Sequence, residues 1–159
     1  MTALRPACAA LALLGTLTLA TQAPAHAATS TAAAQAASYG GSPAGNAALD
    51  WAEAHATGCW YTYGGTSCAH GYDCSGLVME AFGHGAGIWL PRTTYAMLAS
   101  PHLHPIPASQ ARRGDLAFYG SGHVEILTRW HQVTFGAHDQ GTRVGWITEW
   151  MQPTFYRVN

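Results

Sequence analysis

The pattern of the chain changes at Pro107, and this change limits the folds that the sequence can adopt. Beyond Pro107 lie five short runs rich in β-branched and aromatic residues, separated by Gly, Asp and Ser: DLAFY, HVEILTRW, QVTFGAH, VGWITEW and FYRV. Such runs are typical of the strands of an antiparallel sheet. The segments before Pro107 carry helical spacing instead. Helices first and strands second predict an α+β fold, with N-terminal helices packed on a C-terminal antiparallel β-sheet.

The sequence before Pro107 predicts a helix near its middle and another near its end. Residues 45–57 place apolar side chains on one helical face, with Asn46 as the expected N-cap and Gly58 as the stop. Residues 93–100 (TTYAMLAS) predict a short helix that Thr93 caps.

The first 27 residues have the composition of a secretory signal peptide. Arg5 supplies a positive start, an apolar run follows, and Ala25 and Ala27 form an A-x-A cleavage site. The apolar run is shorter than the roughly 20 residues that span a bilayer, which disfavours the alternative of an anchoring helix. The sequence therefore predicts three parts: a signal peptide over residues 1–27, a flexible leader over 28–43 and one folded domain over 44–159.

The charge balance excludes two classes of partner. The 159-residue chain has a formal net charge of −1 and contains no Lys. A nucleic-acid-binding surface needs a basic stripe, and anionic lipids attract polybasic segments. We therefore expect a secreted protein that binds no nucleic acid, and no membrane after signal cleavage.

The cysteines indicate a free thiol. Cys8 leaves with the signal peptide, and an odd number remains, which in an exported protein indicates a free thiol or an intermolecular bridge. Cys59 and Cys68 could pair across a short loop in an oxidising compartment, whereas a Cys68–Cys74 bridge would block the third thiol. Cys59, Cys68 and Cys74 could also be grouped with His70 as zinc ligands, but the paired spacing of zinc sites is absent, so we expect no metal.

Cys74 lies where a thiolate would be stabilised. Residues 73–82 (DCSGLVMEAF) predict a helix that Asp73 caps and that Gly83 and Gly85 end. Cys74 is then in the first turn, where unpaired N–H groups and the helix dipole favour an anion. The thiolate is the reactive form of cysteine. Cys74 is therefore a candidate nucleophile, with a buried structural thiol as the alternative.

His123 is the candidate base for this nucleophile. It begins a β-run, and an imidazole carried by a strand is held rigidly enough for proton transfer. A base needs a partner on its other ring nitrogen. His138, one predicted strand later, is the expected partner and Asp139 is the reserve. Spacing alone does not choose between them and the other histidines of the chain.

Four segments in this order resemble the NlpC/P60 family of papain-like cysteine peptidases. They are Tyr61–Phe82 (with YTYGG and YDCSGLVMEAF), LPRTT at residues 90–94, RRGDLAFY at 112–119 and GHVEI at 122–126. The resemblance covers roughly residues 45–158, which makes 44–159 an expected NlpC/P60 catalytic domain. It implies that Cys74 is the nucleophile, His123 the general base and His138 the residue that orients the base.

The resemblance also implies a substrate and the residues that bind it. The family cleaves bacterial cell-wall peptides, usually between γ-D-glutamate and a diamino acid, without a metal or other cofactor. Tyr61 matches a tyrosine whose hydroxyl lies beside the nucleophile. Asp73 and Ser75 match positions that line the pocket for the free amine end of the stem peptide. We therefore expect a secreted, extracellular or wall-associated peptidoglycan peptidase that acts through a thioacyl intermediate and is a monomer.

Two features depart from the family. Glu125 stands where the family usually has Gly, and we expect its charge to reshape the cleft. The Cys59–Cys68 bridge that we favour is not a family feature. Two other functions stay open: a thiol-dependent amidase or acyltransferase on the same fold, and an inactive secreted protein that binds the wall.

Overall fold

The computed structural model describes residues 40–128, 132–148 and 151–159, so the predicted signal peptide and most of the predicted leader lie outside it. Within these ranges, no helix is both long enough and apolar enough to cross a membrane.

The first described helix, α2 (Pro43–His55), begins before the expected position. Ser42 is its N-cap and accepts a hydrogen bond from the N–H of Gly45 at 3.0 Å. Pro43 takes the first helical position, where the N–H that proline lacks is not needed. The prediction of Asn46 as the cap is wrong. Asn46 is buried inside the helix, and its Oδ1 accepts a hydrogen bond from Arg113.

The next two helices have the caps that the sequence predicts. Asp73 caps α3 (Cys74–Ala86), and its Oδ1 accepts a hydrogen bond from the N–H of Gly76 at 2.7 Å. Thr93 caps the short α4 (Thr94–Leu98) in the same way. The start of α3 is therefore fixed by a side chain next to Cys74.

The expected end of α3 is wrong. The helix continues through Gly83 and Gly85 and ends at Gly87, which takes the left-handed conformation with φ of 72°. Gly85 serves helix packing instead, because a Cβ there would lie 2.5 Å from the carbonyl oxygen of Ala47 in α2. Gly85 therefore lets α2 and α3 approach closely.

The second half of the chain forms a six-stranded antiparallel sheet in the order β3-β8-β4-β5-β6-β7. Its strands are β3 (Leu103–Ile106), β4 (Leu116–Tyr119), β5 (His123–Leu127), β6 (Val133–Gly136), β7 (Gly145–Thr148) and β8 (Thr154–Val158). The sequence pattern missed edge strand β3, which contains Pro105, a residue that sheets tolerate at their edges. A two-stranded ladder of β1 (Thr66–Ser67) and β2 (Gly71–Tyr72), and the 3₁₀ turn η1 (Ala108–Gln110), complete the elements.

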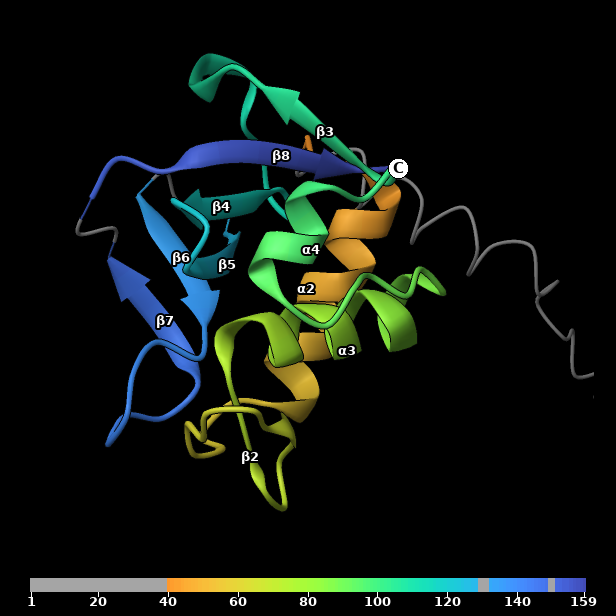
Figure 1. The fold of residues 1–159 in the computed structure, drawn as a ribbon. Helices are drawn as coiled ribbons and strands as arrows, with labels where there is room; N and C mark the ends of the chain where they lie inside the picture. The colour runs from red at the N-terminus through yellow and green to blue at the C-terminus, as the bar shows by residue number, and fades with distance from the viewer. Residues whose placement is uncertain (1–39, 129–131, 149–150) are drawn as a thin grey trace, which may run out of the picture.

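The helices pack beside the sheet, which confirms the predicted α+β class (Figure 1). α3 packs against α2 and against strands β5 and β6. The core is apolar and fully buried, and its largest members are Leu49, Leu77, Phe82, Met97, Leu116, Phe118, Ile126 and Phe135. This packing brings the first turn of α3 next to the first residue of β5.

Candidate active site

The thiol of Cys74 lies at the first position of α3. The residue is 7% exposed and is the free cysteine among the described residues. The N–H groups of the first helical turn have no partner within the helix. The backbone N–H of Cys74 can therefore donate to an anion that forms at the sulfur or beside it.

The imidazole of His123, at the first position of β5, lies beside Cys74 and interacts with it. Its Nε2 lies 3.0 Å from Oε1 of Glu125, which leaves Nδ1 as the ring nitrogen for the thiol. Burial alone would lower the pKa of His123. The hydrogen bonds with Cys74 and Glu125 outweigh burial and raise this pKa to about 9. His123 can therefore carry a proton as an imidazolium at neutral pH.

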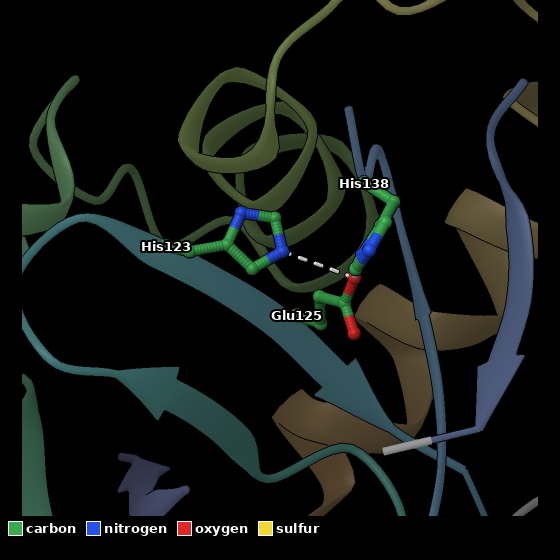
Figure 2. A group of neighbouring side chains, drawn as sticks. All are labelled: His123, Glu125 and His138. Atoms are coloured by element: carbon green, nitrogen blue, oxygen red, sulfur yellow. Dashed lines mark hydrogen bonds and ion pairs between the residues drawn. The ribbon is translucent and has the colours of Figure 1, made fainter. Parts of the chain in front are cut away.

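His138, the expected orienting residue, lies on the segment that follows β6 (Figure 2). Its ring is 5.5 Å from the ring of His123, as pairing of β5 with β6 led us to expect. The two rings meet through a third residue, because Nδ1 of His138 also lies 3.0 Å from Oε1 of Glu125. The reserve candidate, Asp139, accepts a hydrogen bond from the backbone of Gln140.

Glu125 is a site residue that the sequence reasoning misplaced. We expected its charge to reshape the cleft, but its side chain is fully buried and lies between the two histidines rather than in the cleft lining. The sequence did offer one indication that Glu125 lies beside His123. Glu125 follows His123 by two residues, and alternate residues of a strand share a face. The family comparison alone gave no reason to place it behind the base.

A cleft of about 500 Å³ opens over the thiol. Three expected substrate residues line it together with Cys74 and His123: Tyr61, Asp73 and Ser75. The pKa of Tyr61 is raised, first by burial and then by the negative charge of Cys74. The phenol therefore stays protonated and can donate a hydrogen bond at the sulfur side of the cleft.

Arg92, which the sequence reasoning did not single out, also lines the cleft. Its guanidinium bonds both carboxylate oxygens of Asp73, at 3.0 and 2.7 Å, and the hydroxyl of Ser75 at 3.0 Å. Burial would raise the pKa of Asp73, but the hydrogen bonds from Arg92 and from two backbone N–H groups lower it. Arg92 belongs to the LPRTT segment that carried the family resemblance, but its partner Asp73 lies 19 residues earlier in the chain, so the sequence alone did not indicate the contact.

The cysteines are arranged as the favoured hypothesis predicts. Cys59 and Cys68 form a disulfide in the structure, which is the pairing that we favoured, and Cys74 is left as the free thiol. The bridge closes a short loop that contains Tyr61.

One group of donor atoms among the described residues is close enough for a metal ion. The ligand atoms of His123, Glu125 and His138 lie within 4.8 Å of one another. Two imidazoles and one carboxylate suit a transition metal. In the structure these groups satisfy one another through hydrogen bonds, with Glu125 between the two imidazoles.

Sequence comparison with known proteins identifies the NlpC/P60 family, which is the family that the sequence motifs resemble. The model of the NlpC/P60 family matches residues 58–146. The murein DD-endopeptidase MepH of Escherichia coli is 41% identical over 59 residues, which are 37% of this chain and 22% of MepH. The peptidoglycan endopeptidase RipB of Mycobacterium tuberculosis is 44% identical over 59 residues, which are 36% of this chain and 23% of RipB. The matched stretch is therefore less than a quarter of either relative.

Solved structures extend the similarity to most of the domain. The peptidoglycan hydrolase RipB of Mycobacterium tuberculosis superposes with a TM-score of 0.62 at 25% identity, over 92% of this chain and 74% of that chain. The NlpC/p60 domain of the peptidoglycan hydrolase SagA superposes with a TM-score of 0.62 at 28% identity, over 72% of this chain and 98% of that chain.

Proposed function

Because the chain belongs to the NlpC/P60 family, we propose that it is a cysteine endopeptidase of peptidoglycan stem peptides. The bond it cleaves is that between γ-D-glutamate and a diamino acid. The observation that carries this proposal is that Cys74 and His123 line one open cleft and interact there, which raises the pKa of His123. The names of the relatives, which are peptidoglycan endopeptidases, support the substrate class.

The first half of the reaction forms a thioester. Nδ1 of His123 takes the thiol proton, and the Cys74 sulfur attacks the γ-D-glutamyl carbonyl carbon. The carbonyl oxygen becomes an oxyanion, which accepts hydrogen bonds from the backbone N–H of Cys74 and from the hydroxyl of Tyr61. The imidazolium then gives its proton to the amine of the diamino acid, and the carbon–nitrogen bond breaks.

The second half releases the product. A water molecule gives a proton to Nδ1 of His123 and attacks the thioester carbon. The carbon–sulfur bond breaks, the sulfur takes the proton that Nδ1 of His123 holds, and the γ-D-glutamyl carboxyl group leaves and loses its own proton to solvent. His138 belongs to the same unit, because it shares the carboxylate that His123 contacts.

The far side of the cleft suits the amine end of the peptide. Asp73 and Ser75 line it and offer oxygen atoms that accept hydrogen bonds from an ammonium group. Arg92 holds both residues and limits the negative charge that the amine meets. The substrate amine would therefore be bound by oriented acceptors rather than by an unpaired carboxylate.

Export and action on the cell wall are part of the proposal. The signal-like composition of residues 1–27 supports secretion, and the disulfide is typical of an oxidising compartment. Within that proposal the protein acts as a monomer.

Digestion of purified muropeptides tests the function. Mass spectrometry of the products should show cleavage after γ-D-glutamate with the addition of one water, and no cleavage by Cys74→Ala. Products that carry the mass of an added amine would show acyl transfer instead. Undiminished cleavage by Cys74→Ala would contradict the mechanism, and the absence of any cleavage by the unaltered protein would favour an inactive wall-binding role.

A further inference from the structure

We propose that Glu125 is the positioning residue that orients His123, and that His138 acts on His123 through Glu125. This inference deepens the proposed function, on which its kinetic test rests. It concerns a residue that stands where Gly is usual in the family, so family resemblance does not assign it a role.

The position of Glu125 on β5 places it beside the base. His123 and Glu125 are two residues apart in one strand, and their side chains therefore leave the same face of the sheet. Glu125 is among the largest fully buried side chains of the protein. A buried carboxylate is costly unless it is paired and hydrogen-bonded, so this position needs partners.

Those partners are present on both oxygens of the carboxylate. Oε1 accepts hydrogen bonds from Nε2 of His123 and Nδ1 of His138, each at 3.0 Å, and Oε2 accepts one from Oγ1 of Thr134. Burial would raise the pKa of Glu125, but these hydrogen bonds lower it, so the group is a carboxylate at neutral pH. Figure 2 shows the carboxylate lying between the two rings.

The neighbouring strand leaves room for this side chain. Gly136 of β6 faces Glu125, and a Cβ at Gly136 would lie 2.6 Å from Cγ and 3.0 Å from Cδ of Glu125. Any larger residue there would collide with the buried side chain. The glycine and the glutamate therefore form a matched pair, which indicates that Glu125 is built into the site.

The contact decides which nitrogen of His123 carries the proton. An ionised carboxylate only accepts hydrogen bonds, so Nε2 of His123 must donate. The neutral ring then has a free electron pair on Nδ1, which can accept the thiol proton of Cys74. The same carboxylate stabilises the imidazolium that forms when the proton moves.

His138 reaches the base by a longer route. It donates to the oxygen that already accepts from His123, and its ring stands edge-on to that of His123. Removing His138 leaves the His123–Glu125 contact in place, whereas removing the charge of Glu125 affects both histidines. Substitution of Glu125 should therefore lower kcat more than substitution of His138.

Kinetics on muropeptides separate the two roles. Glu125→Gln should lower kcat by about 10²- to 10³-fold with little change in KM, because a charge partner of the base is lost. His138→Gln should cost about tenfold. Glu80→Gln is the matched control, since Glu80 also pairs with a histidine, His84, but on the surface, and it should retain full activity. A kcat within threefold of the unaltered protein for Glu125→Gln, or a larger loss for His138→Gln, overturns the proposal.

A titration that needs no substrate tests the same contact in a protein that keeps Glu125. In Cys74→Ala the thiol partner is gone, so the pKa of His123, followed by NMR, reports the carboxylate. We expect this pKa to stay above 6.5. A value at or below 6.5 overturns the proposal, because a buried imidazole without a charge partner titrates low. This result is independent of whether the protein cleaves peptidoglycan.

Discussion

Arg92 and Asp73 form a two-point ion pair, with Nη1 3.0 Å from Oδ1 and Nη2 2.7 Å from Oδ2, at the residue that caps the helix of the nucleophile. The carboxylate also accepts hydrogen bonds from the N–H groups of Gly64 and Gly76. One side chain therefore joins the loop before α3, the start of α3 and the segment before α4. The position of Cys74 depends on this cluster.

Arg92→Met should destabilise the protein by about 2 kcal/mol at neutral pH. Removing one partner of a fully buried pair costs about 3–5 kcal/mol, and solvent screening at the partly exposed Arg92 reduces that cost. The control is Arg112→Met, because among the described residues the exposed Arg112 guanidinium bonds only backbone carbonyls in its own turn, and its loss should cost under about 0.5 kcal/mol. Urea unfolding measures both, and equal costs would contradict the role of the pair.

The ion pair between Arg92 and Asp73 also predicts how the stability of the protein depends on pH. The pKa of Asp73 is lower in the folded protein than its ordinary value of 3.8, so the unfolded chain binds the proton more readily. The stability from this group is fully present above 3.8 and is lost as the pH falls through the lower folded value. Urea unfolding at neutral pH and near pH 3 should show a smaller acid loss in Arg92→Met than in the unaltered protein. An unchanged acid loss would argue against Arg92 as the cause.

Gly136→Ala should damage the site from the neighbouring strand. The new methyl group would collide with Glu125 and move it from His123, so we expect a loss of about 1–3 kcal/mol in stability and at least a tenfold loss of kcat. Gly145→Ala is the matched control, because Gly145 pairs with Gly136 across β6 and β7 and a Cβ there meets nothing within 4 Å. Equal effects of the two substitutions would refute the matched packing of Gly136 and Glu125.

Reduction of the Cys59–Cys68 bridge should lower stability by about 2.5 kcal/mol, as the entropy of a loop of this size indicates. Thermal unfolding with and without dithiothreitol measures it, in Cys74→Ala so that the free thiol does not interfere. The Cys59→Ser/Cys68→Ser double variant in the same background should not respond to the reductant. A disulfide that contains Cys74, found by non-reducing peptide mapping of active protein, would contradict the assignment.

The alkaline limb of the pH–rate profile should report His123. The imidazolium must protonate the leaving amine, so kcat should fall as the pH rises through the raised pKa of about 9. Glu125→Gln removes one cause of the raised pKa and should move this limb toward lower pH. A limb near 6.5 in the unaltered protein would mean that the hydrogen bonds of His123 do not outweigh its burial.

Local patterns predicted the parts of the site that depend on neighbours in sequence. Asp73 caps α3 because its carboxylate reaches the N–H three residues ahead, and that contact can be read from the sequence. The pairing of consecutive strands brought His138 near His123 for a similar reason. Ser42 was readable as well, since Ser-Pro is a common helix start, but its small polar surroundings suggested a leader.

Contacts between distant residues could not be predicted in this way. Arg92 reaches Asp73 only after the chain has passed through α3, and nothing in the spacing fixes that return. The role of Glu125 depends on strand register, since Gly136 leaves its space and Thr134 and His138 supply its donors. The sequence shows that Arg92 and Glu125 are present, but it does not show which residues they contact.

The rate at which iodoacetamide alkylates Cys74 tests most directly whether His123 activates this thiol. Peptide mass mapping follows the Cys74 peptide in the unaltered protein and in His123→Ala at mildly acidic pH, where an ordinary thiol with a pKa near 8.5 reacts slowly. We predict alkylation at least tenfold faster in the unaltered protein, because the imidazolium stabilises the thiolate. Equal rates in the two proteins would contradict the nucleophile and base assigned to this site.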